Sequence, residues 1–93
     1  MYDEEMLFEA YADNRECRDN NREDVTSREG VIDGFTWWAN HIIGYGGIPA
    51  SEKELKIFIE LVQLEMYSAN YDYSVITDEE WEAIARDIIA KAK

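Results

Sequence analysis

The reactive side chains of this sequence are one histidine and one cysteine. His41 and Cys17 could form a dyad in space, but their neighbours do not resemble the surroundings of an activated nucleophile. Catalysis needs a positioned nucleophile, a base and oxyanion donors together. We therefore expect Cys17 to pack on the inner side of a helix and His41 to lie at the rim of another. We expect a protein that is not an enzyme.

Residue types and spacings also argue against a metal or a cofactor. Zinc sites need paired cysteines or histidines, which the sequence lacks. Residues 19–24 look like a calcium loop, but Asp24 replaces its sharp-turn glycine and Gly30 its bidentate glutamate. Glu5 and Glu9 could share metals, yet the Glu-x-x-His motif of di-iron bundles is missing. The expected cofactor set is none.

Charge is a clearer signal than any motif. The 93 residues carry 21 acidic and 9 basic side chains, a formal net charge of −12. Such a field repels nucleic acid and anionic membranes, whose binding requires Lys and Arg, and it attracts basic protein surfaces. Residues 1–30 hold ten acids, whereas Asp33 is the one charged residue of 31–50. Simple solubility is the alternative explanation of this acidity.

Four helices are expected to position these side chains. Three capping boxes, each a Ser or Thr followed three residues later by Glu, predict helix starts. They are Thr26 with Glu29, Ser51 with Glu54, and Thr77 with Glu80. The predicted helices run over roughly 3–18, 27–43, 52–69 and 78–92. The glycines and proline of 44–49 should end the second helix, and the alternating link 70–76 lacks a partner strand.

Helical phase predicts the buried faces. The predicted core stripe of the second helix is Val31, Phe35, Trp38 and Ile42, and that of the fourth is Trp81, Ile84, Ala85, Ile88 and Ala92. The third helix has one apolar face of Leu55, Phe58, Ile59, Val62 and Met66, and a second of Ile57, Leu61 and Leu64. A helix apolar on two faces is buried on both, so it is either the centre of the bundle or a dimer or partner interface. We favour the centre. The expected fold is all-α: one domain over 1–93, a bundle of about four helices around a central third helix.

The sequence also bounds the compartment. A membrane span needs about twenty mostly apolar residues, and the most apolar region, 31–48, is interrupted by Asp33, Asn40 and His41. The N-terminus has neither a basic head nor an apolar signal segment. Cys17 alone allows no internal disulfide, which favours a reducing compartment. We expect the cytoplasm of a bacterium or of an infected host cell, and no membrane association.

Two aromatic features are candidate contacts for a partner. Trp37 lies about 120° from the core stripe that contains Trp38, and two adjacent tryptophans cannot both enter one narrow core. Trp37 is therefore a candidate exposed anchor of the type enriched at binding hot spots. The alternative is a second core, because Gly30 and Gly34 would admit another helix. Three tyrosines lie between the third and fourth helices: Tyr67, Tyr71 and Tyr73. Tyrosines in a connection suit recognition of a partner, and the alternative is that they close the end of the bundle.

In size, charge and composition the chain resembles two classes of small acidic protein. These are phage DNA-mimic proteins of the anti-restriction and anti-CRISPR kind, and the cognate inhibitors of bacterial nucleases. No residue-level motif carries the resemblance, so no site is transferred. Carboxylates along a rigid helix can nevertheless occupy a groove built for phosphates and pair with its Arg and Lys.

The first functional hypothesis is a non-catalytic inhibitor or decoy that covers a basic surface of a nucleic-acid-handling defence enzyme. It binds no nucleic acid directly. The predicted partner-binding residues are Glu4, Glu5, Glu9, Asp13, Glu16, Trp37, Tyr71 and Tyr73. The alternative is a small helical assembly module, a homodimer formed through the third helix or a subunit of a larger complex.

Overall fold

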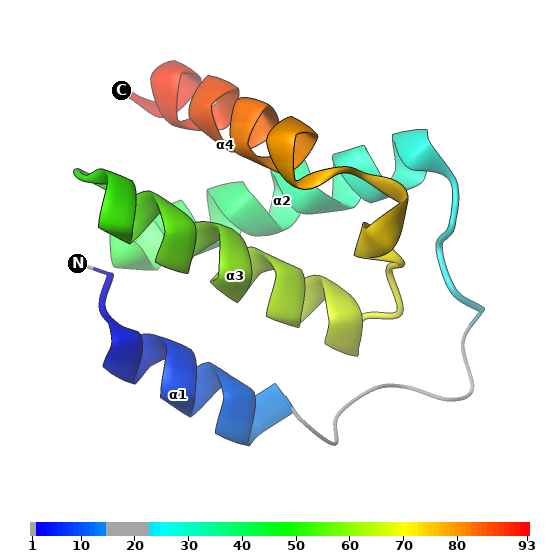
Figure 1. The fold of residues 1–93 in the computed structure, drawn as a ribbon, viewed down its shortest axis with the longest axis horizontal. Coiled ribbons are helices and arrows are strands. Elements are labelled where there is room, and N and C mark those ends of the chain that lie inside the picture. Colours follow the sequence, from blue (N-terminus) through cyan, green and yellow to red (C-terminus); the bar gives the residue numbers. More distant parts are fainter. Residues whose placement is uncertain (1, 15–22) are drawn as a thin grey trace.

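The computed structural model describes residues 2–14 and 23–93, and these form four α-helices (Figure 1). The helices are α1 (Glu4–Asn14), α2 (Arg28–Gly46), α3 (Glu52–Ser68) and α4 (Asp78–Ala92), and a 3₁₀ turn η1 (Tyr73–Val75) precedes α4. The described residues contain no strand beyond one isolated bridge between Val25 and Tyr71. The predicted all-α fold is confirmed. In Figure 1, α1 and α3 run in one direction and α2 and α4 in the other.

The start of α4 matches its predicted capping box. The Thr77 hydroxyl accepts a hydrogen bond from the Glu80 N–H at 3.2 Å, and the Glu80 carboxylate accepts one from the Thr77 N–H at 3.3 Å. Two N–H groups that a helix end leaves without helical partners are thereby satisfied. At α3, Ser51 caps Glu54 as predicted, but the Glu54 carboxylate reaches the N–H of Ala50 instead.

The predicted start of α2 is wrong by one residue. Ser27, not Thr26, is the N-cap, and its hydroxyl accepts from the Gly30 N–H at 3.1 Å. Both residues favour an N-cap, so their adjacency leaves the choice to the packing of the segment before the helix. Glu29 stays in the first turn, where its charge favours the positive end of the helix dipole.

Helix α2 ends within the segment 44–49, as predicted, but it runs three residues beyond the predicted last residue near 43. The helix continues through Gly44 and Gly46, and it stops at Gly47, whose φ of 85° lies in the left-handed region that glycine tolerates. The Gly47 N–H donates to the carbonyl of Ile43 at 3.0 Å. At Gly46 the side chain of Tyr2 comes close: a Cβ built there would lie 3.0 Å from the Tyr2 hydroxyl.

Helix α3 is the centre of the bundle, as predicted, because it contacts α1, α2 and α4. Its first apolar face is buried except for Ile59, which is partly buried, and its second face is buried at Ile57 and Leu61 and partly buried at Leu64. Both faces are thus covered within the chain. Phe58, Val62 and Met66 have no measurable exposure.

The predicted stripes of α2 and α4 need two corrections. In α2, Val31, Phe35 and Ile42 are buried, but Trp38 is only partly buried, and Ala39 completes the core. In α4, Ala92 is exposed, Ile84 is partly buried, and Ile89 joins Trp81, Ala85 and Ile88 inside. Phe35 and Trp81 pack ring against ring with centroids 4.6 Å apart, which joins α2 to α4 across the core.

The segment before α2 is tied to the link after α3. Val25 donates from its N–H to the Asn70 carbonyl at 2.8 Å, and its own carbonyl accepts from the Asp72 N–H at 2.9 Å. Asn70 is buried with a φ of 65°, a left-handed conformation that Asn adopts more readily than most residues. This tie places the ring of Tyr71 against Gly34.

Part of the first predicted helix falls outside this description. The first helix is described to Asn14, so its predicted extension to residue 18, with Glu16 and Cys17, lies outside the described residues. Among the described helices, none is long and apolar enough to cross a membrane.

Candidate partner-binding surface

An exposed aromatic strip runs along α2. It consists of Trp37, His41 and Tyr45, spaced four residues apart, which places them on neighbouring turns of one helix flank. The rings of Trp37 and His41 stack with centroids 5.3 Å apart and an interplanar angle of 6°, and His41 meets Tyr45 edge-on at 5.6 Å. Trp37 is 60% exposed and Tyr45 is 68% exposed. The strip is an aromatic surface open to solvent.

Trp38 supports this strip from below. Its ring contacts Trp37 edge-on at 4.8 Å and His41 edge-on at 5.8 Å, while its other side packs against the core. Trp38 is partly buried, so it links the core to the strip. The prediction of Trp37 as an exposed aromatic is therefore correct in its geometry, and the alternative of a second core around Trp37 is not what the structure has.

Carboxylates lie at both ends of the aromatic strip. At one end, Asp33 lines an open hollow together with Trp37 and His41. At the other end, α1, α2 and α3 enclose a hollow of about 270 Å³. Its lining is Met6, Glu9, Ala10, Asp13, Ile42, Tyr45, Leu61 and Glu65. Of the residues that the structure describes, no Lys or Arg lines either hollow.

The acid-lined hollow combines an apolar floor with negative walls. Met6, Ile42 and Leu61 supply the floor. Although most of the Tyr45 side chain is exposed, partial burial raises the pKa of its hydroxyl, and the Glu65 carboxylate raises it further. That effect reports negative potential at the Tyr45 end of the strip. The aliphatic part of a Lys or Arg side chain could pack against this floor. Its charged group would then lie near the carboxylates and could stack on the ring of Tyr45.

The predicted acids of α1 do not all belong to this surface. Glu5, Glu9 and Asp13 follow one another at intervals of four residues along α1 and are exposed. Glu4 is exposed as well, but it lines the groove on the opposite flank, between α1 and α3. Glu16 lies outside the described residues.

The two tyrosines of the α3–α4 link that were predicted to bind a partner make contacts within the chain. Tyr71 is half-buried in the bridge to Val25, and its ring fills the space beside Gly34. Tyr73 is 36% exposed, and its carbonyl accepts a hydrogen bond from the indole N–H of Trp81 at 3.2 Å. The structure does not bring Tyr73 into the aromatic strip. His41 and Tyr45 were missed by the sequence reasoning, although the four-residue spacing from Trp37 would have identified them.

Three of the described cationic side chains, Arg28, Arg86 and Lys91, pair with carboxylates of α4 or beside it. Arg28 pairs with Glu80, and Arg86 pairs with Glu52 and Glu82 at 2.7 Å each. Lys91 pairs with Asp87 at 3.0 Å. These ion pairs involve the exposed surface of α4, so cations are neutralised there while the aromatic strip stays next to carboxylates. The charge distribution of the described surface is therefore asymmetric.

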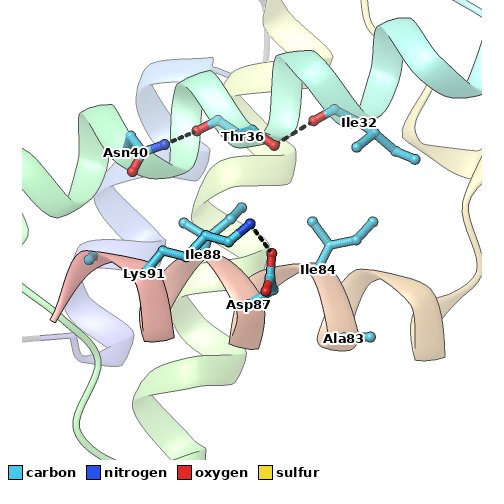
Figure 2. Close-up of a pocket in the computed structure, with 9 residues that line it drawn as sticks. Ile32, Thr36, Asn40, Ala83, Ile84, Asp87, Ile88 and Lys91 are labelled. Atoms are coloured by element: carbon cyan, nitrogen blue, oxygen red, sulfur yellow. Dashed lines mark hydrogen bonds and ion pairs between the residues drawn. The ribbon is translucent and has the colours of Figure 1, made fainter.

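A groove between α2 and α4 adjoins the strip (Figure 2). Its volume is about 430 Å³, and Ile32, Ile84 and Ile88 form its apolar part. The side chains of Thr36 and Asn40 donate to carbonyls one turn earlier on α2, each at 2.9 Å. Thr36 and Asn40 also border the hollow beside Trp37, so the groove extends the apolar surface around α2.

The described residues hold no group of three or more His, Cys, Asp or Glu side chains arranged to bind a metal ion. His41 lies in the aromatic strip, and Cys17 is outside the described residues. Comparisons with protein families, curated proteins and solved structures give no match for this chain. The chemistry of the surface is therefore what indicates how the protein works.

Proposed function

We propose that this protein is a non-catalytic binding protein that covers a basic surface of another protein, in the manner of an acidic inhibitor or decoy. The observation that carries the proposal is the juxtaposition of the exposed aromatic strip with carboxylates at both ends. The strip supplies short-range contacts with the partner, and the carboxylates attract its basic surface over a longer range. Hot spots of protein interfaces combine such aromatic side chains with the arginines of a partner.

The two parts of the surface contribute to different steps of binding. A net charge of −12 accelerates the encounter with a basic partner over distances comparable to the screening length. Trp37 and Tyr45 can then stack on guanidinium groups, which are weakly hydrated and planar. Asp33 and Glu9 can accept hydrogen bonds from the same groups.

The class of partner can be inferred from the proteins that carry many arginines and lysines on one surface. Nucleic-acid-handling enzymes do so because they bind a phosphate backbone. We therefore propose a target among the defence enzymes that cut or bind nucleic acid, and a phage-like anti-defence role such as anti-restriction or anti-CRISPR activity. The protein would act in the cytoplasm of the bacterium.

The test begins by capturing a partner from bacterial lysate on the immobilised protein and identifying it by mass spectrometry. Association is then measured by surface plasmon resonance at low and high salt. The on-rate should fall steeply with salt, and duplex DNA in excess should compete for the partner. A salt-independent on-rate, or a partner with an acidic contact surface, would contradict the proposal.

Matched variants locate the contact. Glu9→Lys and Glu79→Lys change the net charge equally, but Glu9 borders the strip and Glu79 lies in the first turn of α4. Reversal at Glu9 should slow association more than reversal at Glu79. Trp37→Ala should raise the off-rate with little effect on the on-rate, because a short-range contact holds a complex without steering it. Equal effects of both reversals would mean that the charge acts only as a diffuse field.

A further inference from the structure

We propose that the groove between α1 and α3 is the contact surface for a second copy of this chain. This inference is independent of the proposed function, because the groove lies on the flank of α1 opposite to the acid-lined hollow. The groove has a volume of about 340 Å³. Its lining is Glu4, Leu7, Phe8, Tyr11, Lys53, Lys56, Ile57 and Glu60.

The α1 side of the groove exposes the most solvent-accessible large apolar side chain that the structure describes. Phe8 is 72% exposed, and Tyr11, one turn away, is 49% exposed. Leu7 beside them is partly buried and packs against the core. An exposed phenyl group beside an apolar hollow is costly to leave in water, and covering both would bury aromatic surface. An occupant with an apolar ridge and a hollow of its own would cover both.

The same surface supplies both halves of such a contact. A two-fold interface requires a self-complementary patch, in which residue i meets residue j and j meets i. Here Phe8 and Tyr11 form the ridge, and the space between them and Ile57 forms the hollow. A second copy can therefore insert its Phe8 where the first copy has space, and receive the Phe8 of the first.

Charge favours the same arrangement. Glu4 on α1 and two lysines on α3, Lys53 and Lys56, line the same hollow, and they lie in the first two turns of helices that begin at the same end of the bundle (Figure 1). Because α1 and α3 run side by side in one direction (Figure 1), a two-fold axis along the groove sets α1 of one copy on α3 of the other. Each Glu4 then faces the lysines of its partner without any shift along the helices.

The lysines also reduce the electrostatic repulsion that two copies of this acidic chain would otherwise experience at this face. Two chains of −12 repel each other, and the repulsion is smallest where cations offset it locally. Exposed pairs add little free energy by themselves, so burial of Phe8 supplies the attraction. Added salt should screen the overall repulsion and strengthen the dimer, which is the opposite of its expected effect on the steered partner.

Sedimentation equilibrium of the full chain, from micromolar to submillimolar concentration and at two salt concentrations, tests the proposal. We expect a reversible monomer–dimer equilibrium. Phe8→Ala should weaken the dimer by about tenfold or more, and it should not affect folding because Phe8 is exposed. Trp37→Ala, a large-to-small change on the other surface, should leave the dimer unchanged. A parent protein that stays monomeric throughout, or a dimer that responds to Trp37 and not to Phe8, would overturn the proposal.

A charge exchange tests the geometry. Glu4→Lys alone and the double variant Lys53→Glu/Lys56→Glu alone should each dimerise more weakly than the parent, because like charges face each other in both homodimers. Mixed, they should form a heterodimer, because both contacts then pair opposite charges. Circular dichroism of each variant checks that the helices remain. A mixture of folded variants that does not associate would refute the proposed pairing of α1 with α3.

Discussion

The hydroxyl of Tyr2 donates a hydrogen bond of 2.6 Å to the backbone carbonyl of Gly47. The same ring packs edge-on against Phe58 of α3, with centroids 5.5 Å apart, and is 3% exposed. One side chain ahead of α1 thereby joins the end of α2 to the central helix. This contact holds the base of α1, and so both flanks of α1, in position.

Tyr2→Phe should lower the free energy of unfolding by about 1–2 kcal/mol, because the Gly47 carbonyl loses a part-buried donor while the ring packing is kept. Urea denaturation followed by circular dichroism measures the change. Tyr11→Phe, at a side chain that is 49% exposed, serves as the control and should leave the transition unchanged. An unchanged midpoint in Tyr2→Phe would show that the hydrogen bond does not contribute to stability.

The same tyrosine predicts a response to alkaline pH. Burial raises the pKa of Tyr2 to about 12, with smaller contributions from Tyr45 and Glu54. The folded state therefore favours the neutral phenol, and this contribution is complete below the unfolded pKa of about 10. It is lost as pH rises from about 10 through 12. Tyr2→Phe should flatten this part of the stability profile, leaving the smaller response of Tyr45, whose pKa is shifted in the same direction.

Gly34→Ala should destabilise the protein by about 1–3 kcal/mol. A Cβ at this position would lie 2.3 Å from a ring carbon of Tyr71, and the backbone tie to Val25 restricts the movement of that ring. Gly44 in the same helix is the matched control, because nothing lies within 4 Å of a Cβ built there. Gly44→Ala should be neutral or stabilising by up to about 1 kcal/mol, owing to the higher helix propensity of Ala. Thermal melts of both variants measure the two changes in stability.

Acid should weaken the junction between α2 and α4. The hydrogen bond from Arg28, helped by the backbone of Thr77, lowers the pKa of Glu80 to about 2. The stabilisation from the ionised carboxylate is complete above the unfolded pKa of about 4.3, and it is lost as pH falls through the folded value. Glu80→Gln keeps an acceptor for the cap and should reduce the slope of stability against pH in this window. Glu79→Gln removes a charge from the same turn, leaves the Arg28–Glu80 pair intact, and should retain the slope.

Val62→Asp should unfold the domain. Val62 has no measurable exposure in the middle of α3, so the carboxylate would be buried without a partner. The expected cost of several kcal/mol is comparable to the whole stability of a small domain. Glu60→Asp, on the exposed side of the same helix, controls for the lower helix propensity of Asp. A cooperative melt of Val62→Asp at the parental temperature would contradict the burial of this face.

Much of the fold follows from local sequence signals. The Thr77–Glu80 box defines the start of α4 because both side chains bond backbone groups within four residues. The two apolar faces of α3 predict its central position because they require covering on both sides. Local signals could not decide whether Ser27 or Thr26 is the N-cap of α2, because both residues cap well. The bridge from Val25 to the distant link determines where α2 begins.

The binding surface was harder to predict because it depends on contacts between helices. The exposure of Trp37 followed from its phase relative to Trp38. The continuation of α2 through Gly44 did not follow, because glycines usually end helices, and here the distant Tyr2 packs beside Gly46. That continuation carries Tyr45 to the edge of α1 and creates the hollow with Glu9. No local pattern contains this information.

The attachment of α1 has a consequence for the dynamics of the molecule. Among the described helices, α1 makes its main contacts with α3 alone, whereas α3 is enclosed by three helices. Elements with few buried contacts open at lower free energy than the global unfolding. The amides of α1 should therefore exchange with solvent deuterium before those of α3. The helix whose two flanks carry the proposed contacts would be the first cooperative unit to detach, and any molecule bound to either flank would slow that exchange.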